Sequence, residues 1–78
     1  MNSDNENNIF KIHDSYITLG QVLKHFNLIS TGGEAKLFLN ENDVYVNMLL
    51  ERRRGRKVYP GDKVTYLDKT YLICLSEK

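Results

Sequence analysis

The spacing of apolar residues changes from a helical to a strand-like pattern at about Asn42, and this change constrains the fold more than any other feature. Before Asn42, apolar residues recur at intervals of three and four positions, which favours helices packed on a core. After it, short runs rich in valine, tyrosine and isoleucine are separated by turn residues, which favours strands. Because the chain has only 78 residues, we expect two helices and the following strands to share one small domain.

Two helices are predicted in the first half of the chain. The first is expected from Ile17 to Asn27, because Thr18 and Gln21 have capping-box spacing and an apolar stripe follows them. The second is expected to begin at Thr31-Gly32-Gly33-Glu34, which has the same capping-box spacing. The inward stripes are Leu19, Val22, Leu23 and Phe26 in the first helix, and Ala35, Leu37, Phe38 and Leu39 in the second.

The predicted strands lie on both sides of these helices. A short strand is expected from Ile9 to His13, and the others at residues 44–46, 49–52, 58–59, 63–67 and 70–75. The turns between them include Asn47-Met48, Pro60-Gly61-Asp62 and Asp68-Lys69. The domain would then span residues 9–75, with a polar disordered tail at residues 1–8 and a short tail at residues 76–78.

A dense group of cations lies between two of the predicted strands. Five of the six residues from Arg52 to Lys57 are cationic, whereas the net charge of the whole chain is only +1. The charge is therefore a local patch on a nearly neutral body. Cations this close repel one another unless water or an anionic partner surrounds them. The patch is either the solvated tip of a hairpin or a site for phosphate groups, to which arginine is well suited.

Two glycines at the expected start of the second helix also need an explanation, because glycine costs helix stability. Gly32 and Gly33 could permit tight packing against the first helix. Alternatively, they could leave backbone N–H groups open to a phosphate at the positive end of the helix, close to Lys36. Lys24 and His25 suit the last turn of the first helix, and Lys24 could also face an anion.

The sequence contains no recognisable catalytic or metal-binding motif. The serines lack a nucleophile-elbow motif, and His13, His25 and Cys74 are not spaced as metal ligands. The phosphate-binding loop motif of nucleotide hydrolases, GxxxxGK followed by Ser or Thr, is absent. We therefore expect a binding protein that is not an enzyme and uses no cofactor or metal. Tyr45 and Tyr59 are the candidate platforms for stacking on bases, although strand tyrosines more often belong to a core.

The cysteine content and the hydropathy pattern suggest where the protein acts. Cys74 is the single cysteine, which excludes an internal disulfide and fits a reducing cytoplasm. It is expected to be a small buried hydrophobe within the last strand. No apolar run approaches the roughly 20 residues of a membrane-spanning helix. We expect a cytoplasmic monomer that does not contact membranes.

The order of these features resembles the S4 RNA-binding domain over about residues 16–67. The resemblance rests on the runs TGGEAKLFLNENDVYVN and ERRRGRKVYPGDKV, and the start ITLGQVLK is similar to stand-alone bacterial S4 proteins of the YaaA type, whose relatives include YbcJ. It implies an α+β fold, in which two N-terminal helices pack on a small, mostly antiparallel sheet. It also implies binding of structured RNA, namely ribosomal RNA or a ribosome-assembly particle, without catalysis.

The resemblance further implies that RNA lies across the start of the second helix and the basic loop. Carried over by position, the RNA-binding residues would be Thr31, Gly32, Gly33, Glu34, Lys36, Arg52, Arg53, Arg54, Arg56 and Lys57. Lys24 and Asn47 are weaker additions to this surface, and Glu34 could serve only as a helix cap.

One position departs from the family pattern. Met48 follows Asn47 where related domains commonly have glycine, and a positive φ at Met48 would be strained. The hairpin could therefore be reshaped, or an apolar tip of Met48, Leu49 and Leu50 could contact a protein partner. This leaves an alternative function, a protein-interaction adaptor that uses both the basic loop and the tip. A binding module for an enzyme on another chain is a third possibility.

Overall fold

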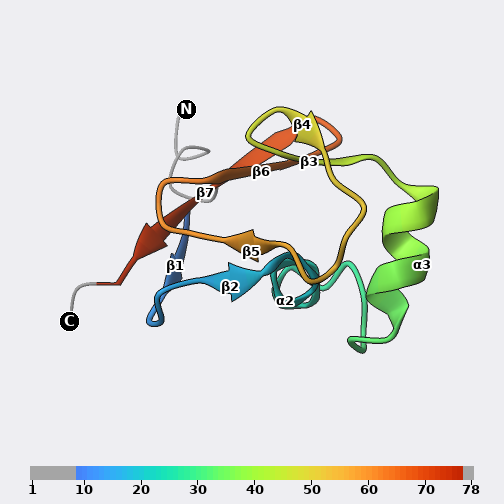
Figure 1. The fold of residues 1–78 in the computed structure, drawn as a ribbon, viewed down its shortest axis with the longest axis horizontal. Coiled ribbons are helices and arrows are strands. Elements are labelled where there is room, and N and C mark those ends of the chain that lie inside the picture. Colours follow the sequence, from blue (N-terminus) through green and yellow to red (C-terminus); the bar gives the residue numbers. More distant parts are fainter. Residues whose placement is uncertain (1–8, 77–78) are drawn as a thin grey trace.

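The computed structural model describes residues 9–76, which form an α+β fold with two helices and a mostly antiparallel sheet, as expected (Figure 1). The elements, in chain order, are β1 Ile9–Ile12, β2 Ile17–Thr18, α2 Leu19–His25, α3 Glu34–Glu41, β3 Val44–Val46, β4 Leu49–Leu50, β5 Lys57–Val58, β6 Lys63–Tyr66 and β7 Lys69–Leu75. The helices are not the first elements, because β1 and β2 precede them. The tail predicted at residues 1–8 and the last two residues lie outside the described range.

The strands form two sheets. The larger has the order β1-β7-β6-β3-β4, in which β1 and β7 are parallel and all other neighbours are antiparallel. The smaller consists of β2 and β5, with Ile17 opposite Val58 and Thr18 opposite Lys57. Because β2 leads directly into α2, this small sheet ties the end of the basic loop to the start of that helix.

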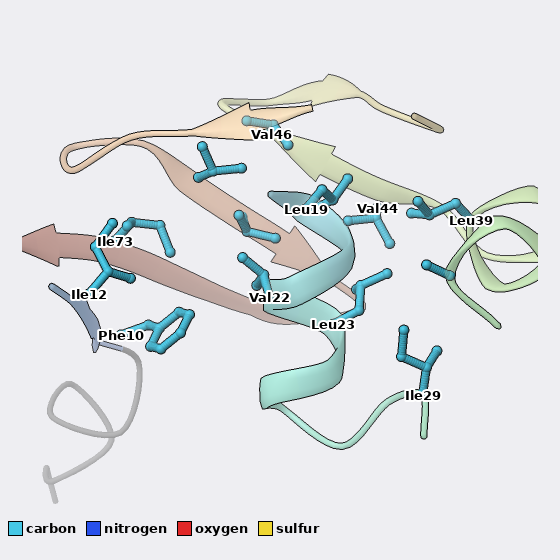
Figure 2. Packing of buried hydrophobic residues seen from close by; sticks show 13 residues of the cluster. Phe10, Ile12, Leu19, Val22, Leu23, Ile29, Leu39, Val44, Val46 and Ile73 are labelled. Carbon is cyan, nitrogen blue, oxygen red and sulfur yellow. The ribbon is translucent and has the colours of Figure 1, made fainter. Parts of the chain in front are cut away.

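The core lies between α2 and one face of the larger sheet (Figure 2). Val44, Val46 and Ile73 project from the strands, and α2 supplies an apolar stripe that meets them. The stripe predicted for α2 is confirmed, since Leu19, Val22 and Leu23 are buried and Phe26 packs against them. In α3, Ala35 and Leu39 are buried and Phe38 is partly buried.

Two predictions about buried side chains were wrong. Leu37 is 60% exposed, because it is two residues from both Ala35 and Leu39 and so projects from the opposite side of α3. Cys74 is only partly buried, because it alternates with the buried Ile73 and therefore faces the side of the sheet opposite the core. Neither helix in the described range is long and apolar enough to cross a membrane.

The helix starts are decided by different hydrogen bonds. In α2 the predicted capping box is confirmed: Thr18 Oγ1 accepts from the Gln21 N–H at 3.3 Å, and the Thr18 N–H donates to Gln21 Oε1 at 3.0 Å. The helix begins at Leu19 and not at Ile17, because Ile17 and Thr18 pair with β5. It ends at His25 and not at Asn27, where φ is 62°.

The capping box predicted for α3 is wrong. Gly33 is the N-cap, and no side chain caps the helix. The Glu34 carboxylate instead accepts a 2.6 Å hydrogen bond from the N–H of Ser30, so it closes the loop that enters the helix.

The two hairpin turns of the large sheet both place non-glycine residues in the left-handed region. The Asn47-Met48 turn is confirmed, with φ of 54° and 73°, which is the geometry of a two-residue turn with positive φ at both positions. The second turn is Leu67-Asp68, one residue earlier than predicted, because Lys69 already pairs with Tyr66. β4 ends at Leu50, two residues before its predicted end, where the chain turns into the basic loop.

Candidate nucleic-acid interface

The basic loop, defined here as residues 51–57, folds back on the first turn of α2. The carbonyl oxygens of Arg54 and Arg56 accept hydrogen bonds from the N–H groups of Gly20 and Leu19, each at 2.9 Å. The first N–H groups of a helix have no partner within the helix, so the loop satisfies two of them. A Cβ on Gly20 would lie 3.4 Å from the Arg54 carbonyl oxygen and 3.5 Å from Ala35 Cβ. These are ordinary van der Waals distances, so the space at Gly20 between α2, α3 and the loop would also admit a single methyl group.

Glu51 is the residue that organises the loop, and sequence reasoning missed it. Its side chain is 8% exposed and lies among cations. Oε2 accepts from the backbone N–H of Arg53 at 3.0 Å and from Arg53 Nε at 2.9 Å. Oε1 accepts from Arg53 Nη2 at 3.1 Å and from Arg56 Nη1 at 2.9 Å. These hydrogen bonds, led by the one from the Arg53 side chain, outweigh the effect of burial and lower the pKa of Glu51 from 4.5 to about 2.

Arg52 is held at the other end of α3. Its Nη1 donates to the carbonyl oxygen of Leu39, and its Nη2 forms an ion pair with Asp43 Oδ1 at 2.9 Å. A cation suits this place, because the last carbonyl groups of a helix carry partial negative charge. Arg52, Arg53 and Arg56 therefore all have carboxylate partners within the protein.

Arg54 and Lys57 are the two loop cations that form no ion pair with residues 9–76. Arg54 Nη1 donates to the carbonyl oxygen of Gly32 at 3.2 Å, which places its guanidinium at the start of α3. Lys57 Nζ lies 5.0 Å from the centre of the Tyr16 ring. Both side chains belong to exposed residues, so their charges are available to a ligand.

One hollow of about 290 Å³ lies between α2 from its N-cap Thr18 to Lys24, the segment that leads into α3, and the basic loop. Lys24 and Arg54 contribute the cations of its lining, and Gly32 contributes backbone. A Cβ on Gly32 would meet no atom within 4 Å, and one on Gly33 would meet only Thr31 Oγ1 at 4.0 Å. Tight packing therefore does not explain these glycines. Within the described chain their N–H groups donate no hydrogen bond, which leaves them open to an anion.

Other predicted site residues lie outside this hollow. Asn47 Nδ2 donates to Asp62 Oδ1 at 3.0 Å, and Asn47 Oδ1 accepts from the Lys63 N–H at 2.9 Å. Asn47 therefore fixes the β3–β4 turn to the start of β6. Thr31 and Lys36 are exposed but do not line the hollow.

A comparison of the sequence with known proteins identifies the family. A family model described as the S4 domain matches residues 10–74, a range that includes both helices, the basic loop and nearly all of both sheets. The chain is also 51% identical over 57 residues to the probable ribosome maturation protein RlbA of Bacillus subtilis (strain 168), an alignment that covers 73% of this chain and 80% of that protein. The chain belongs to the S4 domain family.

Proposed function

We propose that the protein binds structured RNA without catalysing a reaction, and that this RNA is ribosomal RNA or part of a ribosome-assembly particle. The observation that carries the proposal is the hollow where Lys24, Arg54 and the open start of α3 come together. The name of its relative, a probable ribosome maturation protein, supports a ribosomal origin for the RNA. We also propose that the protein acts as a monomer in the cytoplasm and needs no metal or cofactor.

In this mechanism one phosphate of the RNA binds at the start of α3. The free N–H groups of Gly32 and Gly33 donate to it, and Arg54 contacts it from the loop. Lys24 and Lys57 bind neighbouring phosphates, while the pairing of Glu51 with its arginines keeps the loop in place. Phosphate contacts carry little sequence information, so the selectivity for RNA over DNA comes from the shape of the A-form helix and its 2′-hydroxyl groups.

The test compares two charge reversals that change the net charge equally. Arg54→Glu removes the cation at the hollow, whereas Lys63→Glu acts on the opposite side of the sheet, because Lys63 alternates with the buried Val64. Binding is measured by fluorescence anisotropy with structured ribosomal RNA fragments, and matched duplex DNA is the control. We expect Arg54→Glu to weaken RNA binding by about tenfold or more and Lys63→Glu to leave it nearly unchanged. Equal effects of the two variants, or equal binding of RNA and DNA, would contradict the proposal.

The alternative, a protein-interaction adaptor, is favoured by the apolar tip. Met48, Leu49 and Leu50 are 81%, 69% and 49% exposed, and β4 forms one edge of the large sheet. An exposed strand edge with apolar side chains can pair with a strand of another protein. The adaptor is favoured if the association with a partner in cell extract survives nuclease treatment but is lost in the Leu49→Asp variant. The RNA-binding proposal is favoured if nuclease abolishes the association.

A further inference from the structure

Two exposed tyrosines lie side by side next to the basic loop. Tyr16 precedes β2 and Tyr59 follows β5, and because Ile17 pairs with Val58, the two tyrosines occupy neighbouring positions of the small sheet. Their ring centres are 5.7 Å apart. They are 39% and 47% exposed, and neither is among the buried residues of the core. Core formation therefore does not account for this pair.

The Tyr16 ring is in contact with the cationic side of the molecule. The Lys57 ammonium group lies 5.0 Å from its centre, within the range of an attractive cation–π interaction. Tyr16 also lines two neighbouring hollows, of about 590 and 440 Å³. Lys24 lines the larger of these and also the hollow at Arg54, and Gln21 lines all three.

The hollows therefore form a connected strip over the exposed side of α2, from Arg54 at one end to Tyr16 at the other. Lys11, His13 and His25 extend the strip beyond Lys24, and Asp14 is a carboxylate that lines both of the hollows that Tyr16 lines. A nucleic-acid strand that leaves the phosphate site at Arg54 can follow Lys24 to an aromatic ring, with Lys11 as a further cation of the strip. This combination of a positive groove and an exposed ring is typical of sites for single-stranded nucleic acid.

We propose that Tyr16 is a stacking platform for an unpaired nucleotide of the bound RNA. Lys57 binds the phosphate of that nucleotide, and the Gln21 side chain lies within the strip where it can meet the edge of the base. The inference rests on the proposed function and makes it more specific. Bases inside a duplex are already stacked and cannot reach Tyr16, so the preferred ligand is a duplex with an unpaired extension or bulge.

The test uses a short RNA hairpin that is either blunt or carries an unpaired extension, with 2-aminopurine as the fluorescent base in the extension. Tyr16→Leu removes the ring but keeps the apolar bulk, and Tyr16→Phe keeps the ring. We expect Tyr16→Leu to weaken binding of the extended hairpin by about tenfold and to leave the blunt hairpin unchanged. Tyr16→Phe should bind both RNAs as the wild type does. Quenching of 2-aminopurine on binding should persist in Tyr16→Phe and disappear in Tyr16→Leu.

The outcomes separate this site from the phosphate site. If Arg54→Glu weakens binding of both RNAs while Tyr16→Leu weakens them equally or not at all, the stacking site is wrong and the proposed function stands. If Arg54→Glu weakens neither RNA, the proposed function itself fails. Tyr59→Leu gives a second measure, because it leaves the Tyr16 ring and Lys57 in place. It should reduce the preference for the extended hairpin less than Tyr16→Leu does, and an equal or larger reduction would overturn the assignment to Tyr16.

Discussion

At the scale of single residues, the cations of the basic loop fall into two groups according to their partners. Arg53 and Arg56 share the buried carboxylate of Glu51, and Arg52 binds Asp43 at the end of α3. Arg54 and Lys57 have no carboxylate partner in the described range. The first group is expected to determine stability and the second to determine affinity, although all five look alike in the sequence.

Glu51→Gln should lower the free energy of unfolding at neutral pH by about 2 kcal/mol, because it removes the charge that holds two arginines. The folded-state pKa of Glu51, about 2, lies below the ordinary value of 4.5. Its stabilising effect is therefore complete above pH 4.5 and is lost as the pH falls toward 2. Urea unfolding across this range should show that the difference between wild type and Glu51→Gln shrinks as the pH falls.

Asp43→Asn is the matched control for this prediction. Its carboxylate is also in an ion pair with an arginine, but its side chain is 62% exposed. Exposed ion pairs contribute little to stability, so Asp43→Asn should lower the free energy of unfolding by less than about 1 kcal/mol. Glu51 does not hold the loop by its charge if Glu51→Gln lowers the free energy of unfolding equally at pH 3 and pH 7. The same conclusion follows if the decrease is no larger than that in Asp43→Asn.

The cations of the candidate site stand out in the sequence, but their partners within the fold could not be predicted. Charge density is a local property, whereas the burial of Glu51 and the reach of Arg52 to the end of α3 arise only in the folded chain. The glycines at 32 and 33 were singled out correctly as unusual, and the structure removes one of their two explanations. An acidic residue directly before five cations was the available signal for Glu51.

At the scale of secondary-structure elements, the β3–β4 turn keeps its two-residue geometry despite an unsuitable residue. Met48 has a φ of 73° and is 81% exposed, so it bears backbone strain without burying its side chain. Met48→Gly should therefore raise the free energy of unfolding by about 1 kcal/mol. Thermal or urea unfolding will measure this change.

Leu49→Gly is the comparison for the turn, because Leu49 is similarly exposed but has no positive φ. Because the backbone at Leu49 is not strained, Leu49→Gly should destabilise the protein by about 1 kcal/mol. If Met48→Gly is also destabilising, the methionine makes a contribution that its exposure does not reveal. If Met48→Gly stabilises the protein and leaves every interaction unchanged, the idea that the apolar tip binds a protein loses support.

The contact between α2 and the basic loop gives a second prediction at this scale. Gly20→Ala should be tolerated, because a Cβ would only reach ordinary contact with the Arg54 carbonyl oxygen and Ala35. Gly20→Leu should push the loop away, destabilise the protein by about 1 to 3 kcal/mol and weaken RNA binding. Hydrogen exchange at the amides of Leu19 and Gly20 provides the measurement, since both donate to loop carbonyls. Unchanged protection of these amides in Gly20→Leu would contradict the expected displacement.

The elements themselves were largely predictable, because the apolar periodicity of helices and strands is local. Their ends were less so, because contacts from distant parts of the chain decide them. Ile17 was placed in the first helix, but Val58 draws it into a strand. The turn at Leu67 was placed one residue late, because nothing in the sequence indicates a leucine with a φ of 58°.

At the scale of the whole molecule, α2 lies away from the apolar tip of β4, and the basic loop runs from that tip to the region of α2 (Figure 1). The net charge is only +1, so under the proposed function long-range attraction to RNA would be weak and affinity would depend on direct phosphate contacts. If the three cations of the proposed mechanism, Lys24, Arg54 and Lys57, and the exposed Lys36 of α3 each contact one phosphate, the logarithm of the binding constant should fall against the logarithm of salt concentration with a slope of about −3.

Arg54→Glu should make this slope less negative by about one, whereas Lys63→Glu should leave it unchanged. Anisotropy titrations at several salt concentrations measure both slopes. A slope near zero in the wild type would mean that phosphate contacts do not supply the affinity. If the slope changes equally in Arg54→Glu and Lys63→Glu, the overall charge of the protein matters more than the location of the cation.

The parallel pairing of β1 with β7 has a consequence for the order in which the parts of the chain fold. Residues 9–12 pair with residues 72–75, so β1 has no partner until the last strand of the described range has been made. The two helices, the basic loop and the hairpin of β3 and β4 all precede β7 in the chain. We therefore expect the proposed RNA-binding face to take shape first, with the pairing of the distant strands β1 and β7 as the slow, final event.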